Sequence, residues 1–149
     1  MPPDAPERAE AGGDDTLMVF LDASIVIYSV EQPLVWGPKA SARLGALRAA
    51  GEQLATTELV RMECLVGPIK TGDAAVLADF TAFFAAPSVV VLPITTAVAL
   101  RAATIRATYR FQPMDSLHLA AAVEHGCNLF LTNDARLSSL PDIPVEVLT

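Results

Sequence analysis

The chain has 149 residues, of which 52% are apolar and 18% charged, so it supports one compact domain with a buried core and is too short for two. Its formal net charge of −7 argues at first against nucleic acid as a partner, because phosphate contacts come from Lys and Arg. The first fifteen residues hold −4 of this charge (five acids, one base), and residues 16–149 hold −3 (twelve acids, nine bases). If a bound metal neutralised four of those twelve acids, residues 16–149 would carry a net charge of +1. The charge therefore does not exclude nucleic acid as a partner.

The chain begins with a segment that lacks a periodic apolar face and contains prolines, a diglycine and five acids. Such a segment cannot bury enough apolar surface to order itself, so we expect residues 1–16 to form a disordered acidic tail and residues 17–149 to form the folded domain. An acidic start is the opposite of a secretory signal and predicts a cytoplasmic protein. The uncharged stretch from Phe80 to Leu100 is interrupted by Pro87 and Pro93, so we expect no membrane span.

Short apolar runs alternate along the rest of the chain with helical stretches. We predict strands at Met18–Leu21, Gln53–Thr56, Val89–Leu92, Leu129–Leu131 and Val145–Leu148. We predict helices at Lys39–Ala50, Thr57–Val66, Asp73–Ala85, Thr96–Tyr109 and Asp115–His125. In this scheme Gly67-Pro68 ends the second of these helices and Trp36 falls in a loop, where ordinary packing is its expected role. Strands that alternate with helices imply right-handed crossovers, which predict a single α/β domain with a mostly parallel central sheet and helices on both faces.

Four acidic residues stand where the hydrophobic pattern breaks. Asp22 and Asp134 each follow a predicted strand, Asp115 opens a predicted helix, and Glu63 lies inside an apolar helix. Ligands of open α/β sheets bind beyond the carboxyl ends of the strands, and carboxylate oxygens select Mg²⁺ or Mn²⁺ over softer metals. If the fold gathers these acids, they form a hard-cation site suited to phosphodiester chemistry.

Each of the four acids also has a purely structural interpretation. Asp115 follows Pro113 by two residues and suits a helix N-cap, and Asp22 suits the cap of the helix that follows it. Asp134 suits a turn or a cap, and Glu63 suits a solvent-facing helix position. The four acids together indicate a metal site more specifically than any one of them does.

Two histidines and two cysteines carry less information. His118 lies three residues after Asp115 and could approach the site from the same helix, but packing or capping is its expected role. Cys64 and Cys127 lack metal-motif spacing, so we expect them to be reduced and buried.

Four short motifs follow one another in order between Met18 and Thr149. They are Phe20-Leu21-Asp22-Ala23-Ser24, Glu63-Cys64-Leu65-Val66-Gly67, Met114-Asp115-Ser116-Leu117-His118-Leu119-Ala120-Ala121-Ala122 and Leu131-Thr132-Asn133-Asp134. With these motifs the chain resembles PIN-domain ribonucleases, and among them the VapC-like toxins of bacterial type II toxin–antitoxin pairs. Residues 17–149 would then be a PIN-like nuclease domain.

The resemblance implies a Mg²⁺-dependent endoribonuclease, with Mn²⁺ as a substitute, that hydrolyses RNA phosphodiester bonds. Asp22, Glu63, Asp115 and Asp134 would be its metal ligands and catalytic residues. Ser24 and Thr132 align with hydroxyl positions near that site, and local capping is the alternative role of Ser24. The resemblance also implies a cognate antitoxin protein as a partner and pairing into a homodimer.

Two other classes of function stay open at this level. The first is a non-catalytic binding or scaffold module of the same fold, in which the acids are structural. The second is a small α/β domain that binds a phosphorylated small molecule, against which the lack of a glycine-rich loop argues.

Overall fold

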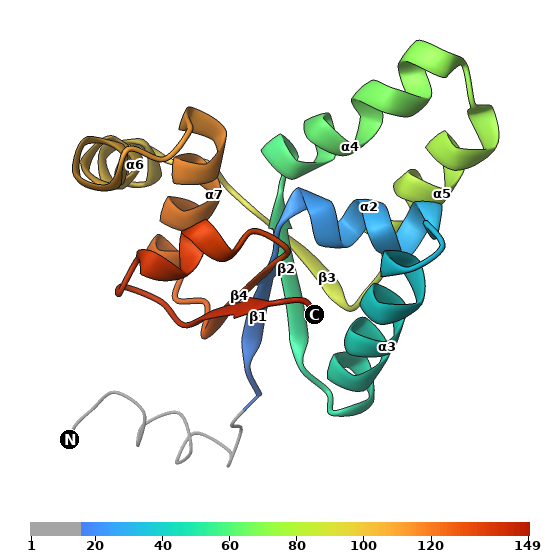
Figure 1. Ribbon diagram of the computed structural model, residues 1–149, viewed down its shortest axis with the longest axis horizontal. Helices are drawn as coiled ribbons and strands as arrows, with labels where there is room; N and C mark the ends of the chain where they lie inside the picture. The colour runs from blue at the N-terminus through green and yellow to red at the C-terminus, as the bar shows by residue number, and fades with distance from the viewer. Residues whose placement is uncertain (1–15) are drawn as a thin grey trace.

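The computed structural model describes residues 16–149, so the predicted tail at residues 1–16 lies outside the described residues except for Thr16. Strands and helices alternate along this part of the chain (Figure 1). The strands are β1 (Met18–Leu21), β2 (Gln53–Thr57), β3 (Val89–Leu92), β4 (Leu129–Thr132) and β5 (Val145–Val147). The helices are α2 (Ala23–Glu31), α3 (Trp36–Ala49), α4 (Glu58–Thr71), α5 (Ala74–Ala85), α6 (Thr96–Tyr109), α7 (Pro113–Glu124) and the short 3₁₀ helix η1 (Ala135–Ser139).

The five strands form one sheet in the order β3-β2-β1-β4-β5, and every neighbouring pair is parallel. Helices α6 and α7 cover one face, and α2, α3 and α5 cover the other, as Figure 1 shows. Helix α4 leaves the carboxyl end of β2 and packs on α5 as a helical hairpin. The predicted α/β class, the parallel sheet and the helices on both faces are thus confirmed.

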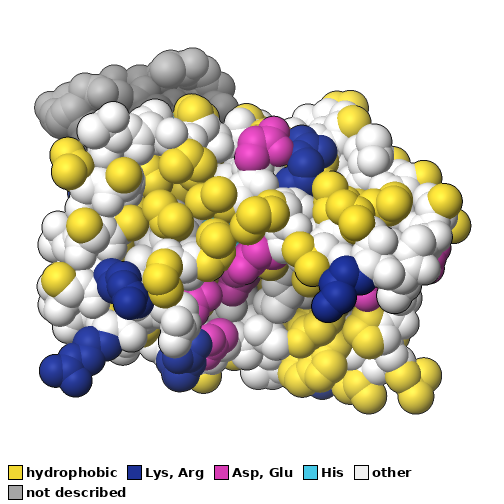
Figure 2. Space-filling view, turned by 90° about the horizontal axis from the view of Figure 1, so that it is seen from above, with side chains coloured by type: hydrophobic (Ala, Val, Ile, Leu, Met, Phe, Trp, Pro, Cys, Tyr) yellow, Lys and Arg dark blue, Asp and Glu magenta, His cyan; other side chains and the backbone are white. Residues whose placement is uncertain are grey.

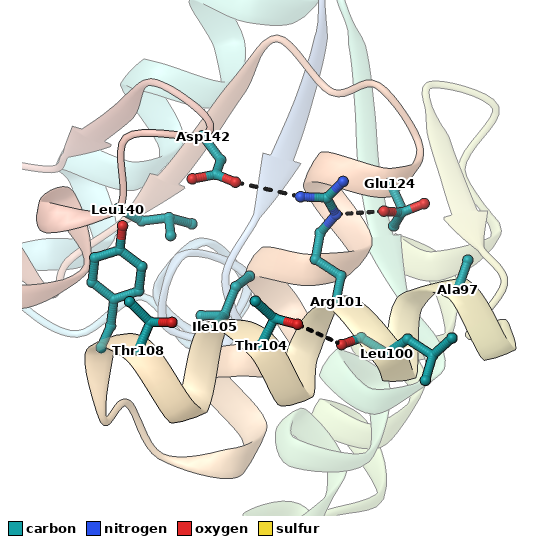
Figure 3. A pocket seen from close by; sticks show the side chains of 10 residues that line it. Ala97, Leu100, Arg101, Thr104, Ile105, Thr108, Glu124, Leu140 and Asp142 are labelled. Atoms are coloured by element: carbon teal, nitrogen blue, oxygen red, sulfur yellow. Dashed lines mark hydrogen bonds and ion pairs between the residues drawn. The ribbon is translucent and has the colours of Figure 1, made fainter.

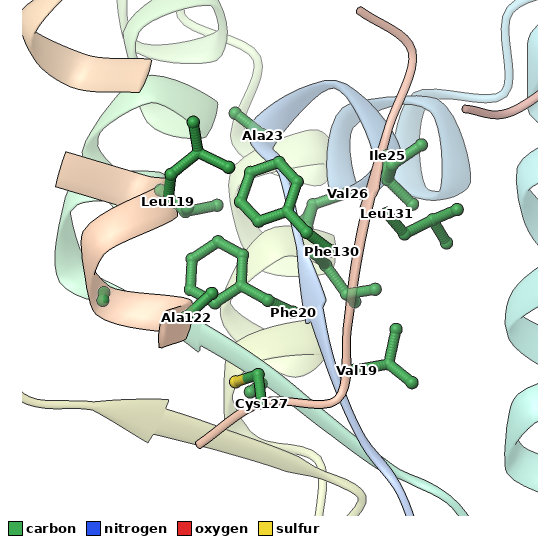
Figure 4. Packing of buried hydrophobic residues seen from close by; sticks show 14 of the residues in the cluster. Val19, Phe20, Ala23, Ile25, Val26, Leu119, Ala122, Cys127, Phe130 and Leu131 are labelled. Carbon is green, nitrogen blue, oxygen red and sulfur yellow. The ribbon is translucent and has the colours of Figure 1, made fainter. Parts of the chain in front are cut away.

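The core lies on both sides of the central strand β1. Phe20 of β1 is in register with Phe130 of β4, and their rings stack with centroids 5.2 Å apart. Leu119 and Ala122 of α7 pack over these rings (Figure 4). The small side chains at residues 120–122 are fully buried, so α7 lies close against the sheet and its first turn is held near the carboxyl ends of β1 and β4.

Three of the predicted helix boundaries are wrong by two residues or more: the start of α3, the end of α4, and the start of α7, which lies at Pro113 and not at Asp115. Helix α4 does not end at Gly67-Pro68 but continues to Thr71, where Gly72 provides a left-handed cap with a φ of 70°. Pro68 is buried within this helix, so packing outweighs the hydrogen bond that a proline removes. Helix α3 begins at Trp36, which is therefore not in a loop; its ring stacks on Tyr28 at 5.8 Å, in the packing role expected for it.

Both cysteines are free and buried, as expected. Within residues 16–149, no helix combines the length and the apolar character that crossing a membrane requires.

Candidate functional site

The four predicted acids come from four different elements at the carboxyl edge of the sheet. Asp22 is the N-cap of α2, Glu63 lies in α4, Asp115 lies in the first turn of α7, and Asp134 is the N-cap of η1. Figure 2 looks down on this edge and shows acidic side chains in a band across the middle of the face, between hydrophobic patches. The parallel sheet accounts for this placement, because it brings the ends of β1, β2 and β4 side by side.

Asp22 is the most deeply placed of the four, with 8% of its surface exposed. Its Oδ1 accepts a hydrogen bond from the Ala23 N–H at 2.8 Å, and its Oδ2 accepts one from the Thr132 hydroxyl at 2.6 Å. Burial raises the pKa of Asp22, and the hydrogen bond from Thr132 opposes that rise. The Thr132 Oγ1 also accepts the Asp134 N–H at 3.1 Å, so one buried hydroxyl joins two of the acids.

Asp115 and Asp134 share the guanidinium group of Arg136. Arg136 donates from Nε and Nη2 to the carboxylate of Asp134, and its Nη2 lies 3.5 Å from Oδ2 of Asp115. The hydrogen bond from Arg136 lowers the pKa of Asp134. Burial, and then the negative charge of Asp22, raise the pKa of Asp115. Asp115 is not the cap of α7, because this helix begins at Pro113 with Gln112 as its N-cap.

Glu63 faces the interior of the site rather than open solvent. Its Oε1 lies 2.7 Å from Nε2 of His118, which is 1% exposed and whose ring lies 6.2 Å from that of Phe20. From the sequence, His118 could approach the site but packing or capping was its expected role, and its hydrogen bond to Glu63 was not predicted. The available signal was its spacing: His118 follows Asp115 by one helical turn and therefore shares a face of α7 with it.

Several buried polar atoms near the acids have no partner in the protein. Among the described residues, the buried side-chain atoms without a hydrogen bond are Ser24 Oγ, Thr56 Oγ1, Ser116 Oγ and His118 Nδ1. Ser24 is two residues from Asp22, and Ser116 is adjacent to Asp115. The Ser24 side chain makes no capping hydrogen bond, although its hydroxyl oxygen is buried.

The acids converge, but their oxygens do not form a ready cage of metal ligands. Across residues 16–149, no three Asp, Glu, His or Cys side chains are arranged to hold one metal ion. Their oxygens are instead hydrogen-bonded within the protein: Thr132 bonds to Asp22, His118 bonds to Glu63, and Arg136 bonds to Asp134. The acids nonetheless act on one another, because Glu63 contributes to the raised pKa of Asp22, and Asp22 and Asp134 contribute to that of Asp115.

The residues present fit a hard divalent cation in chemical type. Carboxylate and hydroxyl oxygens are the ligands that Mg²⁺ and Mn²⁺ prefer, and two of the carboxylates have raised pKa values that a nearby cation would relieve. Arg136, the cation that contacts Asp115 and Asp134, has a side chain that is 63% exposed and can move without disturbing the core.

A separate cavity of about 540 Å³ lies along α6 (Figure 3), and none of the four acids lines it. It is lined by apolar side chains such as Leu100 and Leu140, together with Arg101. Arg101 already donates to Glu124 and Asp142, so its charge is paired. The candidate site is therefore the acidic cluster and not this cavity.

The chain matches the PIN domain over residues 19–143 and belongs to that family. Its fold is similar to a chain in the crystal structure of VapBC2 from Rickettsia felis bound to a DNA fragment from their promoter. The TM-score is 0.75 at 15% identity, over 89% of this chain and 100% of that one.

Two further solved structures share the fold. A chain of the DNA-bound VapBC from Salmonella typhimurium matches with a TM-score of 0.72 at 20% identity, over 90% of this chain and 100% of that one. A chain of a toxin–antitoxin complex from Klebsiella pneumoniae matches with a TM-score of 0.66 at 21% identity, over 88% of this chain and 98% of that one. No curated protein matches the chain.

Proposed function

We propose that this protein is a divalent-metal-dependent endoribonuclease and the toxin of a toxin–antitoxin pair, with Mg²⁺ as its cation and Mn²⁺ as a substitute. PIN nucleases use divalent metals. The observation that carries the proposal is the gathering of Asp22, Glu63, Asp115 and Asp134 at one sheet edge of a PIN domain. Raised pKa values at Asp22 and Asp115 support it, because buried like charges favour a bound cation.

We assign Asp22 and Asp115 as direct metal ligands, Asp134 as the ligand that completes the inner shell, and Glu63 as a ligand or an anchor for a coordinated water. A bound divalent cation supplies a water of lowered pKa and neutralises charge on the scissile phosphate. Thr132 holds the Asp22 carboxylate in place through its 2.6 Å hydrogen bond. The buried, unpartnered Ser24 hydroxyl, two residues from Asp22, is assigned to a hydrogen bond with a carboxylate or a metal-bound water of the site.

The proposal includes an antitoxin protein, RNA as the substrate, and a homodimer acting in the cytoplasm. Support for a protein partner comes from the likeness to chains of toxin–antitoxin complexes and from the surface of α4. Met62, Val66 and Ile69 of that helix are exposed by 48%, 50% and 62% and follow one another at helical spacing. An apolar stripe of this kind next to Glu63 suits a partner helix that covers the site.

A non-catalytic module of the same fold is the second candidate function. It is favoured by one observation: no three acidic, histidine or cysteine side chains of residues 16–149 are arranged around a common metal position. In such a module the hydrogen bonds of Thr132, His118 and Arg136 would serve only to hold the carboxyl edge of the sheet together.

Cleavage of a labelled RNA separates the two candidates. We expect cleavage with Mg²⁺ or Mn²⁺, none with EDTA, and a loss of about a hundredfold or more in Asp22→Asn and Asp115→Asn, because a lost metal ligand removes several kcal/mol of transition-state stabilisation. Asp142→Asn is the matched control, since it changes the same charge at a side chain that pairs with Arg101 far from the site. No metal-dependent cleavage by the wild-type protein, or a background cleavage that is equal in the wild type and all three variants, would support the scaffold function.

The partner is tested in cells. Expression of the chain alone is expected to arrest growth, and co-expression with the product of the neighbouring gene is expected to relieve the arrest. RNA ends mapped from cells with intact protein and with Asp115→Asn should differ at the cleaved sites. Identical RNA ends in both would exclude a ribonuclease.

A further inference from the structure

His118 is an almost completely buried side chain that contacts the acidic cluster. It is 1% exposed, compared with 8% for Asp22, and it lies on α7 one turn after Asp115. Its Nε2 reaches across to α4 and lies 2.7 Å from Oε1 of Glu63. The two residues are 55 positions apart in the sequence, so only the packing of α4 against α7 brings them together.

The surroundings of the ring indicate where its proton lies. Nδ1 is buried and has no hydrogen-bond partner, while Nε2 faces the Glu63 carboxylate. A buried N–H without an acceptor is costly, and a carboxylate oxygen is a strong acceptor. The tautomer with its proton on Nε2 satisfies both conditions, so His118 donates and Glu63 accepts.

The ring is also held rigidly, whereas Glu63 alone would not be. His118 packs against Phe20 in the core, with the ring centroids 6.2 Å apart. The Glu63 side chain is 34% exposed and has three rotatable bonds, so without a partner it would sample many positions. A fixed donor on one oxygen limits those positions and leaves the other oxygen of the carboxylate free.

We propose that His118 is a positioning residue that holds the Glu63 carboxylate toward Asp22 and Asp115 and thereby raises the affinity of the site for a divalent cation. This inference rests on the proposed function. His118 itself is not a metal ligand here, because its one nitrogen that faces the site is already bonded to Glu63. Partners that orient metal ligands in this way typically change metal affinity by about 10- to 100-fold when they are removed.

The test measures Mn²⁺ binding to the purified protein by isothermal titration calorimetry, which does not depend on nuclease activity. His118→Leu, which removes the donor, is expected to weaken Mn²⁺ binding by about tenfold or more. His118→Gln, which places an amide N–H near the position of Nε2, is expected to restore most of the affinity. His125→Leu is the matched control, because His125 lies at the end of the same helix and its Nε2 bonds to the Pro93 carbonyl, away from the acids.

A double mutant separates positioning from packing. If His118 acts through Glu63, then His118→Leu causes no further loss of Mn²⁺ affinity in a Glu63→Ala background. If the leucine variant fails to fold, His118→Asn replaces it, because asparagine places its amide near Nδ1 and cannot donate to Glu63. The inference then predicts most of the wild-type affinity for the glutamine variant and weaker binding for the asparagine variant.

Two results would overturn the positioning role of His118 without affecting the proposed function. One is Mn²⁺ binding as tight in His118→Leu as in the wild type. The other is an equal loss of Mn²⁺ affinity from His118→Leu with and without Glu63. A wild-type protein that binds no Mn²⁺ would overturn both this inference and the proposed function. A wild type that binds Mn²⁺ but does not cleave RNA would overturn the proposed function and leave the positioning role standing.

Discussion

Replacement of Thr132 with valine is expected to destabilise the protein with almost no change in side-chain volume. Thr132 is fully buried, and its Oγ1 donates to Asp22 at 2.6 Å and accepts the Asp134 N–H at 3.1 Å. Valine keeps the shape and the β-branch but removes both hydrogen bonds. A bond to a charged group contributes about 1.5–3 kcal/mol and a neutral one about 0.5–1.5 kcal/mol, so we expect the free energy of unfolding to fall by about 2–4 kcal/mol at neutral pH without metal.

The stability that Thr132→Val loses should become smaller as the pH falls. Burial raises the pKa of Asp22 in the folded state above its ordinary value of 3.8, and the Thr132 hydrogen bond counters that rise. The folded protein therefore takes up this proton before the unfolded chain does, and the cost of the buried charge disappears as the pH falls through the folded pKa. The difference between Thr132→Val and the wild type should shrink as Asp22 becomes protonated.

Urea denaturation in EDTA, followed by circular dichroism, measures the effect. Thr56→Val is the matched control, because Thr56 is equally buried in the same sheet but its Oγ1 has no hydrogen-bond partner. Removing an unsatisfied hydroxyl should leave the stability unchanged or raise it by about 1 kcal/mol. Equal losses in the two variants, or a Thr132→Val protein as stable as the wild type, would refute this reasoning.

Three further predictions follow from the same geometry. In EDTA, the raised pKa values of Asp22 and Asp115 should make the melting temperature rise as the pH is lowered from 7 toward their folded pKa values. Saturating Mn²⁺ should flatten this pH dependence. The same dependence of melting temperature on pH with and without Mn²⁺ would contradict the prediction. Arg136→Gln removes the cation that competes for Asp134 and Asp115, so calorimetry should show tighter Mn²⁺ binding, and weaker binding would show that Arg136 supports the site. Phe130→Ala should cost about 3–5 kcal/mol in urea denaturation, because its buried ring stacks on Phe20, whereas exposed Leu100→Ala should change stability by less than about 0.5 kcal/mol.

Local sequence patterns were sufficient for most of the fold. The run Val89–Leu92 and the stretch Thr96–Tyr109 have the bounds that their composition predicts, because continuous β-branched residues and alanine-rich helix formers act within a few residues of chain. The helix through Pro68 could not be predicted in this way. A proline is unfavourable inside a helix when only the chain itself is considered, and the packing of α4 on α5 that outweighs it involves residues outside that segment.

The sequence by itself also indicated which acids stand where strands end, because Asp22 directly follows an apolar run and Asp134 comes three residues after the last residue of one. Only the tertiary structure decided what those acids contact. Thr132 bonds to Asp22 across 110 positions, His118 bonds to Glu63 across 55, and Arg136 lies between Asp115 and Asp134. The physical reason is that strand and helix formation depend on nearby residues, whereas a side chain's hydrogen-bond partner depends on which elements the parallel sheet and its helices bring within about 3 Å of each other.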